Sequence, residues 1–123
     1  MRWAWLLLLV PASALACGVC VEDRVAAAYD HAVVVRSLER KHEVVFLAIE
    51  GDVAASARLS REIQGALDST PGVDRGSARV SLPSASLSFA YDPARNKLGP
   101  IMSALEKSPA LKGLRLSLLR VIA

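Results

Sequence analysis

Val44-Val45-Phe46-Leu47-Ala48-Ile49 is an unbroken run of apolar residues. A strand with one face in water would alternate apolar and polar residues, because successive side chains point to opposite faces of the sheet. A continuous apolar run of this length is typical of a strand that is covered on both faces. We therefore expect residues 44–49 to form the central strand of a sheet, with a layer of structure packed on each side.

The chain after this strand has the spacing and turn residues of an alternating α+β domain. The pattern predicts a helix at 53–67, strands at 78–82 and 87–91, a short helix at 100–106 and a strand at 114–122. Thr70-Pro71-Gly72 ends the first of these helices, and Pro83-Ser84 forms the turn between the two strands. The order βαββαβ predicts a ferredoxin-like sandwich, in which two helices cover one face of an antiparallel four-stranded sheet.

An additional helix is predicted before the central strand. Apolar residues recur at helical spacing along one stripe, at Val21, Val25, Ala28, Ala32, Val35 and Leu38. We expect one continuous helix from Val21 to Lys41. Because the two helices of the sandwich cover only one face of the sheet, this leading helix is expected to cover the other face.

Composition and charge exclude several classes of protein. The chain has 123 residues, of which 53% are hydrophobic, and this excludes a disordered or fibrous protein. The formal net charge is only +3, and the basic residues are dispersed along the chain. We therefore expect no nucleic-acid partner.

The first sixteen residues have the layout of a secretory signal peptide. Met1-Arg2 is a positive start, residues 3–10 are apolar, and Ala14-Leu15-Ala16 supplies the small residues of a cleavage site. The apolar run is far shorter than the roughly 20 residues that a membrane-spanning helix needs. We expect a signal peptide at 1–16, a C-x-x-C segment with the leading helix at 17–42, and the ferredoxin-like domain at 43–123. The mature protein is then secreted or periplasmic, with no transmembrane span.

Residues 44–121 resemble the heavy-metal-associated (HMA-like) domain of copper chaperones and metal-pumping ATPases. The resemblance is carried by Leu67, by Pro71-Gly72-Val73 after the first helix of the sandwich, and by Phe89-Ala90-Tyr91-Asp92-Pro93. It implies the ferredoxin-like fold and the binding of a soft metal ion such as copper. It also implies a metal-transfer or membrane protein as partner.

The sequence departs from this family at the metal site. The family carries a C-x-x-C motif in the loop between the first strand and the first helix of the sandwich. If Gly51 matches the glycine that opens the family motif, Ala54 and Ala57 stand where the cysteines would be. Alanine cannot bind a metal ion, so the domain is degenerate at this loop, and metal binding does not follow from the fold alone.

The two cysteines of the chain, Cys17 and Cys20, form a C-x-x-C upstream of the domain. Four interpretations remain open. The pair binds a soft metal, since two thiolates suit Cu(I). It is a redox dithiol, although Glu22 and Asp23 oppose a thiolate there. It is a disulfide that ties down the mature terminus. Or Cys17 is a lipid anchor, because Ala14-Leu15-Ala16-Cys17 resembles a permissive lipobox with Ala14 in place of the preferred leucine.

No other cluster of residues suggests catalysis. The chain shows no Ser-His-Asp set, phosphate-binding loop or paired-carboxylate cleft, so we do not expect an enzyme. The alternatives to a metal-binding module are a thiol oxidoreductase and a structural or interaction domain that binds no metal. His31 would lie roughly 16 Å from Cys20 along a continuous helix, too far for both to bind one ion. We expect His31 and His42 to be surface histidines.

The leader gives a direct prediction. Exported protein should begin at Cys17, which intact mass and N-terminal sequencing would show. The same mass would reveal an added lipid, a retained metal or the loss of the thiol hydrogens to a disulfide. Exported protein that still begins at Met1 would contradict the prediction.

Overall fold

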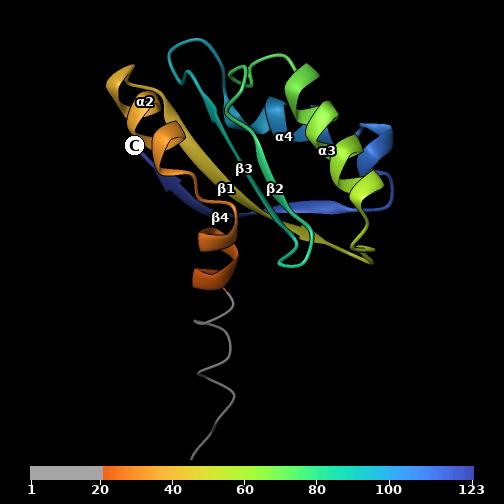
Figure 1. Ribbon diagram of the computed structural model, residues 1–123. Coiled ribbons are helices and arrows are strands. Elements are labelled where there is room, and N and C mark those ends of the chain that lie inside the picture. The colour runs from red at the N-terminus through yellow and green to blue at the C-terminus, as the bar shows by residue number, and fades with distance from the viewer. Residues whose placement is uncertain (1–20) are drawn as a thin grey trace, which may run out of the picture.

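The computed structural model describes residues 21–123 (Figure 1). Residues 21–27 are helical. The elements that follow are α2 (His31–Glu39), β1 (Glu43–Glu50), α3 (Ala57–Ser69), β2 (Arg79–Ser81), β3 (Ser86–Tyr91), α4 (Leu98–Glu106), the 3-10 helix η1 (Pro109–Leu111) and β4 (Arg115–Ile122). The βαββαβ order expected from the sequence is therefore confirmed.

The four strands form one antiparallel sheet in the order β2-β3-β1-β4. The central strand β1 pairs with β3 on one side, where Val45 lies opposite Phe89, and with β4 on the other, where it lies opposite Val121. Residues 44–49 are all buried. This is the ferredoxin-like α+β fold, and the prediction of a central strand covered on both faces is confirmed.

The sheet separates two hydrophobic cores. The larger core lies under α3 and α4 and includes Val45, Leu47 and Ile49 of β1. The smaller core lies on the opposite face, where Val44 and Phe46 pack against the segment before β1 (Figure 1). The side chains of β3 also divide between the two cores. Its residues Leu87, Phe89 and Tyr91 enter the larger core, and Ala90 enters the smaller one.

The prediction of one continuous leading helix was wrong. The helix at residues 21–27 ends before Asp30, whose backbone is extended at φ −131° and ψ 112°. The Asp30 carboxylate accepts hydrogen bonds from the backbone N–H groups of Ala32 and Val33, at 3.0 and 3.3 Å, and so caps a second helix. Because α2 restarts in a different phase, Val35 and Leu38 are 41% and 38% exposed instead of buried.

The first helix of the sandwich also begins later than predicted. α3 starts at Ala57 rather than at Val53, because Ser56 is its N-cap and accepts a hydrogen bond from the Leu59 N–H at 3.1 Å. Residues 51–56 therefore remain a loop between β1 and α3. Val53 contributes to the larger core from that loop, which accounts for the apolar residue there.

Burial of β1 on both faces can be tested one face at a time. Phe46→Ala removes a side chain from the smaller core and Leu47→Ala removes one from the larger core. Each should lower the free energy of unfolding by about 2–5 kcal/mol, because each leaves a cavity. Leu118→Ala is the control, since Leu118 is 53% exposed on β4 and should change stability by less than about 1 kcal/mol. Urea unfolding measures all three, and a Phe46 variant as stable as the control would refute burial by the leading segment.

Candidate functional site

The two cysteines proposed as metal ligands, Cys17 and Cys20, lie outside the described residues. From the short turn between the leading helix and the first strand, we expect the C-x-x-C to lie on the same edge of the domain as the loop that carries Ala54 and Ala57. This expectation is not tested at the cysteines themselves. The described residues do show where the chain goes immediately after the C-x-x-C, and where the loop that carries Ala54 and Ala57 lies. The candidate site is built from these two segments.

The helical residues 21–27 are fastened to the sheet by side chains from β3. The Ser86 hydroxyl donates a hydrogen bond to the Arg24 carbonyl at 2.8 Å, and the Ser88 hydroxyl donates one to the Ala28 carbonyl at 2.7 Å. Val21 and Val25 pack in the smaller core. The segment that follows the C-x-x-C is therefore a packed layer of the domain and has a fixed position on the sheet.

The loop at residues 51–56 leaves the sheet at the end of β1. Gly51 has a φ of +121°, and a Cβ at this position would lie 3.0 Å from the Leu114 side chain, so the turn requires glycine. Ala54 and Ala57 are both exposed. The loop therefore keeps the exposed position of a binding loop, but its side chains offer no ligand for a soft metal.

The two segments lie next to each other. The Arg24 guanidinium is 4.0 Å from the Glu50 carboxylate, at the point where β1 passes into the loop. Ala27 lines a shallow groove of about 400 Å³ together with Ala55, Ser56 and Ala57 from the loop and the start of α3. The chain after the C-x-x-C thus contacts the edge of the sheet at which the loop at residues 51–56 begins.

Charges near the C-x-x-C are partly neutralised by pairing. Glu22 accepts a hydrogen bond from Arg120 on β4, and this hydrogen bond, together with the positive charge of the guanidinium, lowers the pKa of Glu22. The same contact raises the pKa of Arg120. Glu22 would therefore oppose a nearby thiolate less than the sequence indicates, because its negative charge is paired with the Arg120 guanidinium. Asp23 remains exposed.

The two histidines lie at opposite ends of α2. His31 is exposed and its Nδ1 lies 3.2 Å from the Tyr29 hydroxyl, as expected for a surface histidine. The same expectation was wrong for His42, which is half-buried: its Nδ1 lies 2.6 Å from the Asp74 carboxylate and its Nε2 lies 3.7 Å from that of Asp92. These partners are 32 and 50 residues away, so local spacing gave no signal of the cluster.

Residues 21–123 contain neither a cluster of potential metal ligands nor a helix that could span a membrane. In this part of the chain no group of three or more His, Cys, Asp or Glu side chains is placed to hold a metal ion. None of the helices that the structure describes is long and apolar enough to cross a membrane.

Comparison with solved structures agrees with the fold. A copper-binding domain from HMA7, a P-type ATPase, superimposes with a TM-score of 0.53 at 21% sequence identity, covering 66% of this chain and 99% of that domain. The N-terminal domain of a potential copper-translocating P-type ATPase from Bacillus subtilis, in the Cu(I)-loaded state, gives 0.51 at 23% identity, covering 66% and 91%. No protein-family model and no curated protein matches the chain. The chain is thus similar in fold to copper-binding domains of ATPases.

The attachment of the leading segment can be tested at Ser88. Ser88→Ala removes the hydrogen bond to the Ala28 carbonyl and leaves that buried group unpaired, which should cost about 1–3 kcal/mol. The substitution should also accelerate amide hydrogen exchange in residues 21–28, relative to the parent protein, more than it does in β1. Ser103→Ala, at an exposed position on α4, is the matched control and should change neither quantity. Equal exchange rates in the two variants would mean that Ser88 does not hold the segment.

Proposed function

We propose that this protein is an exported soft-metal-binding module, of the Cu(I) type, whose ligands are Cys17 and Cys20. The proposal combines the copper-binding domains among its neighbours in fold with the C-x-x-C that precedes the domain. The observation that carries it is the position of residues 21–27, which pack beside the loop at 51–56. A pair of thiols just before residue 21 could therefore bind a metal ion at the edge of the domain where the loop at 51–56 lies.

The loop at residues 51–56 contains no cysteine, so the thiols of a soft-metal site at this edge must come from another part of the chain. Gly51 and the exposed loop after it are present. If Gly51 matches the glycine that opens the family motif, Ala54 and Ala57 stand at the positions of the family's cysteines. Function resides in the ligands and not in the fold, so a domain of this kind binds a soft metal only if thiols reach it from elsewhere in the chain. Cys20 is bonded directly to Val21, which packs in the smaller core. The C-x-x-C therefore precedes a residue whose position is fixed on the sheet.

The chemistry of the pair suits Cu(I). Thiolates are soft ligands, and metal binding requires both thiols to lose their protons, so affinity should rise with pH until the pair is fully deprotonated. Cys20 directly precedes helical residues, and a helix N-terminus lowers the pKa of a thiol. The Glu22–Arg120 pair limits the negative charge next to the thiols.

Location and partner follow as parts of the same proposal. The signal-peptide layout of residues 1–16 would place the protein outside the cytoplasm, where the pair must be kept reduced to bind metal. A module of this kind would exchange its ion with a metal-transfer protein or a membrane transporter. Lipidation of Cys17 would remove one of the two thiols and is incompatible with a two-thiolate site.

Metal binding should depend on the displaced cysteines and on reduction. The reduced protein should bind one Cu(I) per chain with a Kd of about 1 μM or below, measured by competition with a chromophoric Cu(I) chelator. The oxidised protein should bind none, and the Cys17→Ser, Cys20→Ser double variant should lose binding. If that variant retains the affinity of the parent, or the reduced parent binds no Cu(I), the proposal fails.

A gain-of-function variant provides the matched control. Ala54→Cys and Ala57→Cys, introduced into the double serine variant, restore two thiols at the family's own positions. Ala54 lies in the loop and Ala57 at the start of α3, and both are exposed. The fold should therefore tolerate the change, and Cu(I) binding should return. Its return, with loss in the double serine variant alone, would show that the scaffold supports the site and that the natural chain supplies its thiols from residues 17 and 20.

A further inference from the structure

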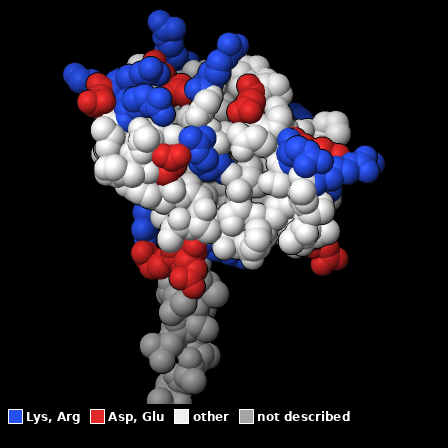
Figure 2. Space-filling model, viewed as in Figure 1, with Lys and Arg blue, Asp and Glu red and all other residues white. Residues whose placement is uncertain are grey.

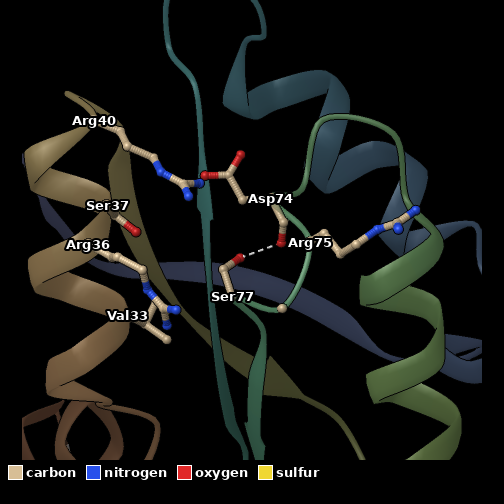
Figure 3. A pocket seen from close by; sticks show the side chains of 8 residues that line it. Val33, Arg36, Ser37, Arg40, Asp74, Arg75 and Ser77 are labelled. Carbon is tan, nitrogen blue, oxygen red and sulfur yellow. Dashed lines mark hydrogen bonds between the residues drawn. The ribbon is translucent and has the colours of Figure 1, made fainter.

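A small polar cavity lies between α2 and the turn at residues 74–77, on the part of the molecule away from the loop at 51–56. Its volume is about 110 Å³, and it is lined by Val33, Arg36, Ser37, Arg40, Asp74, Arg75, Gly76 and Ser77. Arg36 and Arg40 project from one face of α2 toward the turn, whereas the Arg75 side chain points away from them (Figure 3). In the space-filling view, Lys and Arg side chains lie at the same end of the molecule, with Asp and Glu side chains among them (Figure 2).

Arg36 and Arg40 bring two positive charges to this cavity, and Asp74 brings one negative charge. Within residues 21–123, neither Arg36 nor Arg40 forms a side-chain ion pair or hydrogen bond, although five other arginines pair with carboxylates. Asp74 also lines the cavity, but its Oδ2 is held by the His42 Nδ1 at 2.6 Å. Two guanidinium groups therefore face a space that contains one carboxylate, Asp74, toward which Arg40 extends (Figure 3).

Ser37 provides a second and independent observation. It is only 6% exposed, yet its hydroxyl has no hydrogen-bond partner among the residues that the structure describes. Buried hydroxyl groups in proteins are nearly always paired, since leaving one unpaired costs free energy. Ser37 lies between Arg36 and Arg40 in the chain, and all three line the cavity. A bound oxyanion would supply the missing partner.

The turn on the other side of the cavity adds backbone donors. The Ser77 N–H bonds to the Asp74 carbonyl at 3.2 Å, and Gly76 has a φ of +77°. Within residues 21–123, the N–H groups of Arg75 and Gly76 donate to no protein acceptor. The Arg79 guanidinium holds the Gly76 carbonyl at 3.1 Å, and the Ser77 hydroxyl joins the turn to β3 by accepting from the Ala90 N–H at 2.9 Å. The turn is therefore a fixed wall of the cavity.

We propose that this cavity binds a phosphate group, held by the Arg36 and Arg40 guanidiniums, the Ser37 hydroxyl and the N–H groups of the turn. Guanidinium groups match the oxygens of phosphate in geometry and charge. The volume suits a single phosphate group, since pockets for larger organic ligands measure about 300–1,000 Å³. The site is separate from the metal-binding proposal, because none of its residues belongs to the C-x-x-C itself, to residues 21–27 or to the loop at 51–56.

The helix dipole offers a different reason for Arg36 and Arg40. Cations are favoured in the last turn of a helix, and both residues lie at the end of α2. That explanation accounts for the charges but leaves the Ser37 hydroxyl without a partner. It also predicts no saturable binding of phosphate, so the two explanations can be separated by titration.

The test is a titration of the purified protein with inorganic phosphate against chloride at matched ionic strength, followed by ¹H–¹⁵N NMR. Phosphate should give saturable shifts at the Arg36 and Arg40 side chains, Ser37 and residues 75–76. Arg36→Gln and Arg40→Gln should each weaken binding about ten-fold or more, because each removes a charge-assisted hydrogen bond. Arg61→Gln, the same change at an exposed position on α3, is the control and should leave the affinity unchanged.

Ser37→Ala separates a ligand-binding role from a structural one. It should weaken phosphate binding several-fold, yet it should not lower the stability of the phosphate-free protein, because the hydroxyl has no partner there to lose. Glycerol 3-phosphate, titrated in parallel, shows whether the site takes the free ion or an esterified group, and saturable binding of either supports the proposal. Shifts that chloride reproduces, or that Arg61→Gln weakens as much as Arg36→Gln does, would overturn it.

Discussion

The burial of β1 on both faces is the constraint on which the rest of this structure depends. The α3–α4 layer covers Val45 and Leu47, but Val44 and Phe46 point to the opposite face and would be exposed in a bare ferredoxin-like sandwich. Phe46 is fully buried because residues 21–39 form an additional layer over it. In this layer the Tyr29 ring lies nearly parallel to the Phe46 ring, with the two ring centroids 6.3 Å apart. The apolar sequence of the strand and the extra layer therefore require each other.

That additional layer places the chain after the C-x-x-C on the domain. An N-terminal extension without such a layer could occupy many positions, whereas residues 21–27 are fixed by Ser86 and Ser88 and by contacts in the smaller core. The same packing that stabilises the sheet thus brings Arg24 and Ala27 to the edge where the loop at 51–56 lies. The layer formed by residues 21–39 thus covers the second face of β1 and is also the basis for the proposal that the metal ligands are displaced to Cys17 and Cys20.

The break at Asp30 has a comparable consequence for the other end of the layer. Because Asp30 restarts the helix, α2 presents Val33, Val34 and Ser37 to the protein and leaves Val35 and Leu38 at the surface. Arg36 and Arg40 then face the turn at 74–77. Asp30 also bonds Arg79 at 2.9 Å, so that its N-cap role and its ion pair both lower the pKa of its carboxyl group. One residue therefore fixes the phase of α2 and links it to β2.

The sequence by itself determined the strands, the turns and the central position of β1, because those features depend on local periodicity and on turn residues such as Pro83 and Gly51. It also determined that Ala54 and Ala57 offer no metal ligand. Only the tertiary structure decided the break at Asp30, the pairing of His42 with Asp74 and the cavity beside Ser37. Asp30 is a good N-cap residue, but the apolar stripe from Val21 to Leu38 concealed its signal. The other features join residues that are far apart in the chain and depend on how two layers meet, which local spacing does not encode.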